Sequence, residues 1–110
     1  NVAGEVMRRG PALRSRMAQV AAATGALRKV RGVGFVAAAD LVDPITGQAF
    51  PAERRTGWQV FREAVGLGAW LRPLGDTIYF LPPLNTPDPV LDRLAEITAM
   101  AINRAVAGRG

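Results

Sequence analysis

The stretch Trp70-Leu71-Arg72-Pro73-Leu74-Gly75-Asp76-Thr77-Ile78-Tyr79-Phe80-Leu81-Pro82-Pro83 indicates most about how this chain folds. An arginine ends one apolar run, a Pro-Leu-Gly-Asp turn follows, and a second apolar run ends in two prolines. The pattern predicts a tight β-hairpin with strands over 69–73 and 77–81. Its turn would present the Arg72 guanidinium beside apolar and aromatic side chains. A planar fork that is always charged can hold a carboxylate by two parallel hydrogen bonds, so Arg72 is the first candidate binding residue.

Arg72 also has an ordinary interpretation, which the residues alone leave open. It could pair with an acid such as Asp76, or lie along the surface, as most arginines do.

Working outward from the hairpin, three segments carry the apolar periodicity of helices, over 1–23, 52–66 and 87–107. Gly10-Pro11 should kink or interrupt the first helix, because proline lacks an N–H and clashes with the preceding turn. Thr24-Gly25 should end it, because glycine readily takes the left-handed conformation that follows a last helical turn.

The segment 30–42 predicts a strand buried on both faces, because small and apolar residues alternate with β-branched valine. Asp43-Pro44-Ile45-Thr46-Gly47 has the residues of a turn. Thr86 can cap the last helix, and Pro87 suits its first position.

Together these elements predict one α+β domain, 1–110, built as a two-layer sandwich with a small, mainly antiparallel sheet. The sheet has about three strands, and helices cover it. The expected strands are 30–42, 69–73 and 77–81, and the expected helices are 1–23, 52–66 and 87–107.

Composition excludes several classes of function. The 110 residues include no cysteine and no histidine, which removes thiolate metal sites, disulfides and the usual general base at neutral pH. The net charge is +5, yet the thirteen arginines are scattered and lack interleaved aromatic residues, so most should be solvated and nucleic-acid binding is not expected. No apolar run is long enough for a membrane span, and residues 1–16 lack the apolar core of a signal peptide, so we expect a cytoplasmic protein without membrane contact.

The remaining polar candidates favour structural roles. Lys29 is the only lysine and therefore the only possible Schiff-base former, but it lies between arginines at a strand entrance and suits the surface better. Gly32-Val33-Gly34 does not have the spacing of a phosphate-binding loop. Asp40 and Asp43 are too dispersed for a metal site, and no combination of side chains assembles a nucleophile with a base. We therefore expect no catalytic and no metal-binding residue in this chain.

Five segments carry a resemblance to a known family. They are Val30-Arg31-Gly32-Val33-Gly34-Phe35-Val36, Thr46-Gly47, Gly57-Trp58, Leu71-Arg72-Pro73-Leu74-Gly75-Asp76-Thr77-Ile78 and Pro82-Pro83-Leu84. The chain resembles the C-terminal segment of class III aminotransferases, which are pyridoxal-phosphate enzymes of fold type I. The resemblance covers nearly the whole chain. It is strongest to the branch that aminates 8-amino-7-oxononanoate in biotin synthesis.

The resemblance implies that this chain is the small C-terminal domain of a larger enzyme and is inactive by itself. Pyridoxal 5′-phosphate and its lysine would belong to a large domain upstream, so Lys29 should not inherit the catalytic role and no cofactor is expected in this chain. Arg72 matches the family arginine that binds the carboxylate of the keto-acid substrate. The implied partners are that keto acid, the large domain and a second subunit of a homodimer. The amino donor, adenosylmethionine or lysine, stays open.

Two alternatives remain. The chain could belong to another class III ω-aminotransferase, which would use Arg72 on a different carboxylate. It could also be an independent basic binding module, whose partner would be sensitive to salt.

Overall fold

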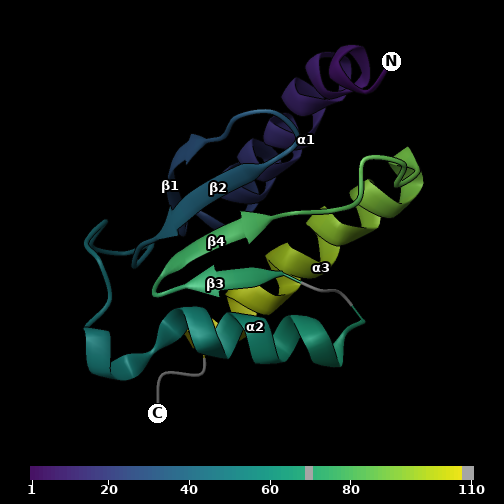
Figure 1. The fold of residues 1–110 in the computed structure, drawn as a ribbon. Coiled ribbons are helices and arrows are strands. Elements are labelled where there is room, and N and C mark those ends of the chain that lie inside the picture. The colour runs from purple at the N-terminus through teal and green to yellow at the C-terminus, as the bar shows by residue number, and fades with distance from the viewer. Residues whose placement is uncertain (69–70, 108–110) are drawn as a thin grey trace.

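The computed structural model describes residues 1–68 and 71–107, with the backbone but not the side chain of Arg72. The described elements, in chain order, are α1 (Val2–Thr24), β1 (Leu27–Arg31), β2 (Ala37–Leu41), the 3₁₀ turn η1 (Ala52–Arg54), α2 (Thr56–Gly66), β3 (Arg72–Leu74), β4 (Thr77–Phe80) and α3 (Asp88–Ala107). The strands form one antiparallel sheet in the order β1-β2-β4-β3, so β3 lies at an edge (Figure 1). The predicted α+β class is confirmed.

The helices pack on one face of this sheet and on each other. Helix α1 contacts α3, β1 and β2, and α2 contacts α3 and β3. Figure 1 shows α1 and α3 behind the sheet and α2 alongside β3. Alternate residues of β2 and β4 point into this layer and are almost fully buried; they are Ala37, Ala39, Leu41, Ile78 and Phe80. The residues between them, on the same two strands, therefore lie on the second face of the sheet, away from the helices.

The prediction of a single strand over 30–42 was wrong. The chain makes two antiparallel strands there, β1 and β2, joined by a tight turn. A Cβ on Gly32 would lie 2.0 Å from the Val36 carbonyl oxygen, and Gly34 has a φ of +59°, so both glycines are needed for the reversal. Burial is also uneven, because β2 is largely buried whereas most of β1 is exposed.

The predicted interruption at Gly10-Pro11 was also wrong, because α1 continues through it to Thr24. Tertiary packing explains the difference. A Cβ on Gly10 would lie 2.2 Å from the Gly34 carbonyl oxygen, so this point of the helix touches the β1–β2 turn backbone to backbone. The predicted end at Gly25 is confirmed, with a φ of 66° and its N–H donating to the Ala21 carbonyl.

The expected helix over 52–66 is divided at Arg55, whose φ of 51° separates η1 from α2. Two of the large apolar side chains of α2 are partly exposed. Trp58 and Val65 are each 42% exposed, although Trp58 stacks on Phe61 at 5.4 Å between ring centroids. The residues of α2 that reach the core are Thr56, Gly57, Val60 and Ala64.

At the start of α3, the hydroxyl of Thr86, the predicted helix cap, makes a different hydrogen bond. The Thr86 hydroxyl donates to the Pro83 carbonyl at 2.6 Å, and the helix begins at Asp88. Val90, in the first turn of this helix, is 53% exposed. The buried residues of α3 are Leu91, Ala95, Ile97, Thr98, Ala101, Ile102, Ala105 and Val106.

Candidate functional site

Arg72, the predicted carboxylate-binding residue, begins β3 and pairs with Tyr79 of β4. Tyr79 pairs in turn with Ala38, and Ala38 pairs with Arg31, so one row crosses all four strands of the sheet. The side chain of Arg72 and the whole of Trp70 lie outside the described residues. The binding role of Arg72 therefore stays a prediction, with only its backbone position known.

A polar cluster lies on the second face of the sheet, next to this row. The Arg31 guanidinium donates to Asp40 Oδ1 at 2.8 Å, and the Thr77 hydroxyl donates to the same oxygen, also at 2.8 Å. The hydrogen bond from Arg31 is the main reason that the pKa of Asp40 lies below its usual range, and the same bond raises the pKa of Arg31. Arg31 is thus already paired with a carboxylate of its own chain.

The turn between β3 and β4 is fastened to two other elements through Asp76. Its Oδ1 accepts a hydrogen bond from the Gly57 N–H at 2.8 Å, at the start of α2. Its carbonyl oxygen accepts from the Leu41 N–H, again at 2.8 Å, at the end of β2. Asp76 therefore has a defined structural partner in the α2 backbone.

A hollow of about 500 Å³ lies between the β3–β4 hairpin and the segment 49–58, which leads into the first turn of α2. Aromatic side chains from two segments line it, Phe50 and Trp58, together with Pro73 of β3 and Asp76 of the turn. The Arg55 guanidinium sits 5.4 Å from the centre of the Trp58 ring. The α2 side of β3 is therefore open, with apolar walls and a nearby cation.

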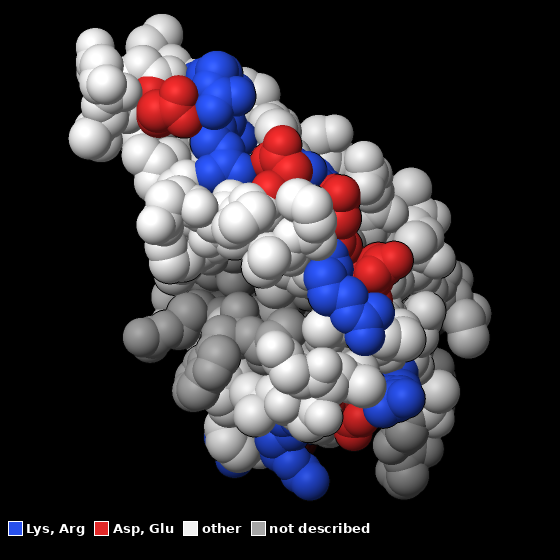
Figure 2. Space-filling model, turned by 90° about the vertical axis from the view of Figure 1, so that its right-hand side faces the viewer, with Lys and Arg blue, Asp and Glu red and all other residues white. Residues whose placement is uncertain are grey.

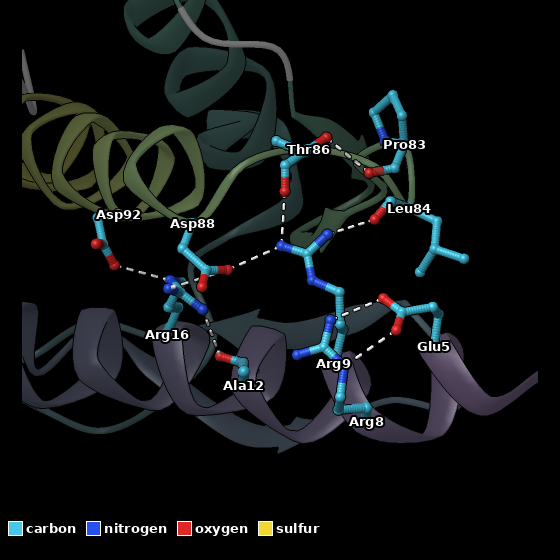
Figure 3. Close-up of polar contacts among 10 residues, drawn as sticks. All are labelled: Glu5, Arg8, Arg9, Ala12, Arg16, Pro83, Leu84, Thr86, Asp88 and Asp92. Atoms are coloured by element: carbon cyan, nitrogen blue, oxygen red, sulfur yellow. Dashed lines mark hydrogen bonds and ion pairs between the residues drawn. The ribbon is translucent and has the colours of Figure 1, made fainter. Parts of the chain in front are cut away.

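The other end of the hairpin, where β4 leads into α3, is held by Arg9 (Figure 3). The Arg9 guanidinium donates to the Leu84 carbonyl, to the Thr86 carbonyl at 2.6 Å and to the Asp88 carboxylate at 2.8 Å. It also lies 5.2 Å from the centre of the Phe35 ring. The hydrogen bond from Arg9 is the main cause that lowers the pKa of Asp88. Arg9 is 9% exposed and ties α1 to the loop after β4.

Sequence reasoning missed this anchor, because it treated most arginines as solvated. A signal was present, since Arg9 lies four residues before Leu13, and Leu13 lies four before Met17 on the buried face of α1. Arg16 adds a second contact from the same helix, with its Nε 2.9 Å from the Asp92 carboxylate. The first half of α1 is thereby joined to α3 by charge as well as by packing.

The remaining sequence candidates have structural positions. Lys29 is exposed on β1, with a φ of 56°. Gly32 and Gly34 form the β1–β2 turn and precede no helix. Glu63 of α2 lies 3.7 Å from Arg104 of α3, as an exposed ion pair. Among residues 1–68 and 71–107, no group of three or more potential metal ligands comes together.

Charge is mixed on the face that Figure 2 shows, where acidic side chains lie next to basic ones. A continuous basic stripe of the kind that follows a nucleic-acid backbone is not seen on that face. None of the helices in the described part of the chain is long and apolar enough to cross a membrane.

Comparison with known proteins gives consistent relatives, although no protein-family model matches the chain. The chain is 38% identical over 80 residues to the adenosylmethionine-8-amino-7-oxononanoate aminotransferase of Geobacter sulfurreducens, covering 72% of this chain and 18% of that protein. It superposes on an omega-aminotransferase from Paracoccus denitrificans with a TM-score of 0.86 and 25% identity, covering 99% of this chain and 24% of that one. A transaminase from the marine bacterium Virgibacillus gives a TM-score of 0.86 at 25% identity, covering 96% of this chain and 25% of that one.

These matches relate the chain to a limited part of each relative. It spans less than a fifth of the Geobacter protein and about a quarter of each solved transaminase. The two solved structures share the fold of this chain, and the names of all three relatives describe the transfer of an amino group.

Proposed function

Because this chain belongs to the C-terminal part of class III, pyridoxal-phosphate-dependent aminotransferases, we propose that it is the substrate-carboxylate-binding part of such an enzyme. The proposed reaction converts 8-amino-7-oxononanoate to 7,8-diaminononanoate in biotin synthesis. The substrate assignment follows the name of the Geobacter relative, which aligns with 72% of this chain.

The observation that carries the proposal is the place of Arg72 in the fold. It starts the edge strand β3, in a hairpin that is fastened at the turn by Asp76 and beyond β4 by Arg9. A guanidinium on such a supported strand can grip a carboxylate with two parallel hydrogen bonds. Holding the far carboxylate of a keto acid fixes the distance and direction of its ketone, and so orients the carbon that receives the amino group.

The cofactor would be held elsewhere in the full-length protein. Pyridoxal phosphate, when bound, accepts an amino group from the donor and passes it to the ketone. A Schiff-base lysine needs an enclosed site that lowers its pKa. Lys29, the only lysine of this chain, is exposed on β1 and does not fit that role. We assign the cofactor to a large domain outside this chain and expect a homodimer of cytoplasmic subunits.

The test uses the full-length enzyme with Arg72→Ala, Arg72→Lys and, as a matched control, Arg62→Ala on the exposed surface of α2. Loss of two charge-assisted hydrogen bonds should raise the KM for 8-amino-7-oxononanoate at least about tenfold. Cofactor absorbance should not change. Arg72→Lys should restore little of the affinity for the keto substrate, because the ammonium group of lysine lacks the planar fork of a guanidinium. Unchanged keto-substrate kinetics in Arg72→Ala would refute the proposal, and an equal effect of Arg62→Ala would show a general charge effect instead.

A second candidate, another ω-aminotransferase, is favoured by the superposition on the Paracoccus enzyme. The same arginine would then bind a different carboxylate. A panel of acceptors that includes pyruvate and 8-amino-7-oxononanoate separates the two, because only the true acceptor should give a high kcat/KM.

A further inference from the structure

We infer that Asp76 is a positioning residue for substrate binding, through which α2 sets the place of the β3–β4 hairpin and thereby of Arg72. The inference rests on the proposed function, because Asp76 is assigned no contact with substrate. It extends the site from one binding residue to the contact that holds the binding strand.

The first support is the bonding of Asp76 itself. Asp76 accepts two hydrogen bonds from backbone N–H groups. Its carboxylate accepts from Gly57 of α2 and its carbonyl from Leu41 of β2, each at 2.8 Å. The Gly57 N–H belongs to the first turn of α2, where backbone donors have no partner within the helix. The Asp76 carboxylate satisfies one of them, and its negative charge suits the positive end of the helix dipole.

The second support is the close approach of the two backbones. A Cβ on Gly57 would lie 2.1 Å from the Gly75 carbonyl oxygen and 3.3 Å from the Asp76 Cα. Gly75 has a φ of +59°, which glycine adopts without strain. The turn therefore touches the helix through main-chain atoms, and the Asp76 bond holds it at that distance.

The third support is that β3 is short and, among the described residues, has few other contacts to fix its position. This strand has three residues, Arg72–Leu74, and lies at the sheet edge, where β4 is its one neighbour among the strands that the structure describes. Its α2 side borders the hollow lined by Trp58 and Pro73. Without the Asp76 bond, the turn and β3 could move toward this hollow. A displacement of about 1 Å would weaken both hydrogen bonds from a guanidinium to a bound carboxylate, because hydrogen bonds depend steeply on distance and angle.

The experiment measures steady-state kinetics of the full-length enzyme with Asp76→Ala and Asp76→Asn, using 8-amino-7-oxononanoate and pyruvate as acceptors. Asp76→Ala should raise the KM for the acceptor about tenfold with kcat within about twofold, because binding geometry changes while chemistry does not. Asp76→Asn keeps an oxygen that can accept the Gly57 N–H, so its KM should stay close to that of the wild type. A general loss of folded protein would lower kcat and leave KM unchanged.

The matched control is Asp43→Ala. Asp43 Oδ1 accepts a hydrogen bond from the Ile45 N–H at 2.8 Å, within the turn that follows β2, so the same chemical change is made at a carboxylate that bonds within its own turn. This variant should leave the acceptor KM unchanged. An increase equal to that of Asp76→Ala would overturn the inference.

The double variant Arg72→Ala/Asp76→Ala separates the inference from the proposed function. If Asp76 acts through Arg72, the double variant should have the KM of Arg72→Ala alone. If Arg72→Ala raises KM and Asp76→Ala does not, or if the two effects multiply, Asp76 is not a positioning residue and the function of Arg72 stands. If Arg72→Ala itself has no effect, the proposed function fails and the role of Asp76 fails with it.

Discussion

Removal of the Arg9 guanidinium should destabilise the fold far more than removal of the guanidinium next to it on α1. Arg9 is 9% exposed and donates to the carbonyls of Leu84 and Thr86, which lie 75 and 77 residues away. A hydrogen bond that involves a charged group contributes roughly 1.5–3 kcal/mol. The Phe35 ring, 5.2 Å away, adds roughly 0.5–1 kcal/mol.

Arg9→Ala leaves the two carbonyls without their partner, and water can replace part of the lost bonding. We therefore expect a loss of about 3 kcal/mol in the free energy of unfolding. The bond to Asp88 is left out of this figure, because that carboxylate is 70% exposed and solvent screens it.

The assay is urea unfolding of the 110-residue chain followed by circular dichroism, with Arg8→Ala as the control. The Arg8 side chain is 67% exposed, and its partner in the described part of the chain is Glu5, three residues before it. Arg8→Ala should therefore leave the midpoint of urea unfolding almost unchanged. Arg9→Lys keeps the charge but not the fork, and should fall between wild type and Arg9→Ala.

Equal midpoints for Arg9→Ala and Arg8→Ala would refute the reasoning. That result would mean that the buried guanidinium adds no more than a solvated one, and that packing alone joins α1 to the loop after β4.

Three further outcomes follow from the packing and the charges. Gly57→Ala should lower the free energy of unfolding by about 1–3 kcal/mol, because its Cβ would meet the Gly75 carbonyl at 2.1 Å. Gly66 is also on α2, but a Cβ there would meet no atom of residues 1–68 or 71–107 within 4 Å, so Gly66→Ala should stabilise by about 0.5–1 kcal/mol in the same denaturation assay. The hydrogen bond from Arg31 is the main cause that lowers the pKa of Asp40 from its usual 3.8. The contribution of Asp40 to the free energy of unfolding is therefore complete above pH 3.8 and is lost as the pH falls through the lower pKa of the folded state. Asp40→Asn should therefore flatten that part of an acid-unfolding curve, and an unchanged curve would exclude the ion pair as its cause.

Much of the fold could be predicted because its signals are local. Helical periodicity located all three long helices to within a few residues, and the turn chemistry of Asp43 and Gly47 located the turn before η1. The hairpin of β3 and β4 was also predicted, although Pro73 and Leu74, which were expected in the turn, belong to β3, and the turn itself is Gly75-Asp76. Each of these features depends on residues within a few positions of one another.

Two of the failures depend on contacts between residues that are distant in the sequence. Gly10-Pro11 looks like a break until Gly34 supplies a packing surface for that point of the helix. Thr86 has the residue type of a helix cap, but its hydroxyl donates to the Pro83 carbonyl. The carbonyl of Thr86 accepts a hydrogen bond from the Arg9 guanidinium. The run over 30–42 hid a turn, because apolar residues continue across it.

In the candidate site, too, local features were predicted and long-range contacts were not. The sequence by itself identified Arg72 as a binding candidate and placed it in a hairpin, because a charged fork within an apolar ribbon is visible in the order of residues. Only the tertiary structure decided what supports that hairpin, namely the bond from Gly57 to Asp76 across 19 residues and the burial of Arg9 against the loop after β4. A sequence records which donors and acceptors exist, whereas their pairing depends on which backbones approach closely enough for one carboxylate or one guanidinium to join them.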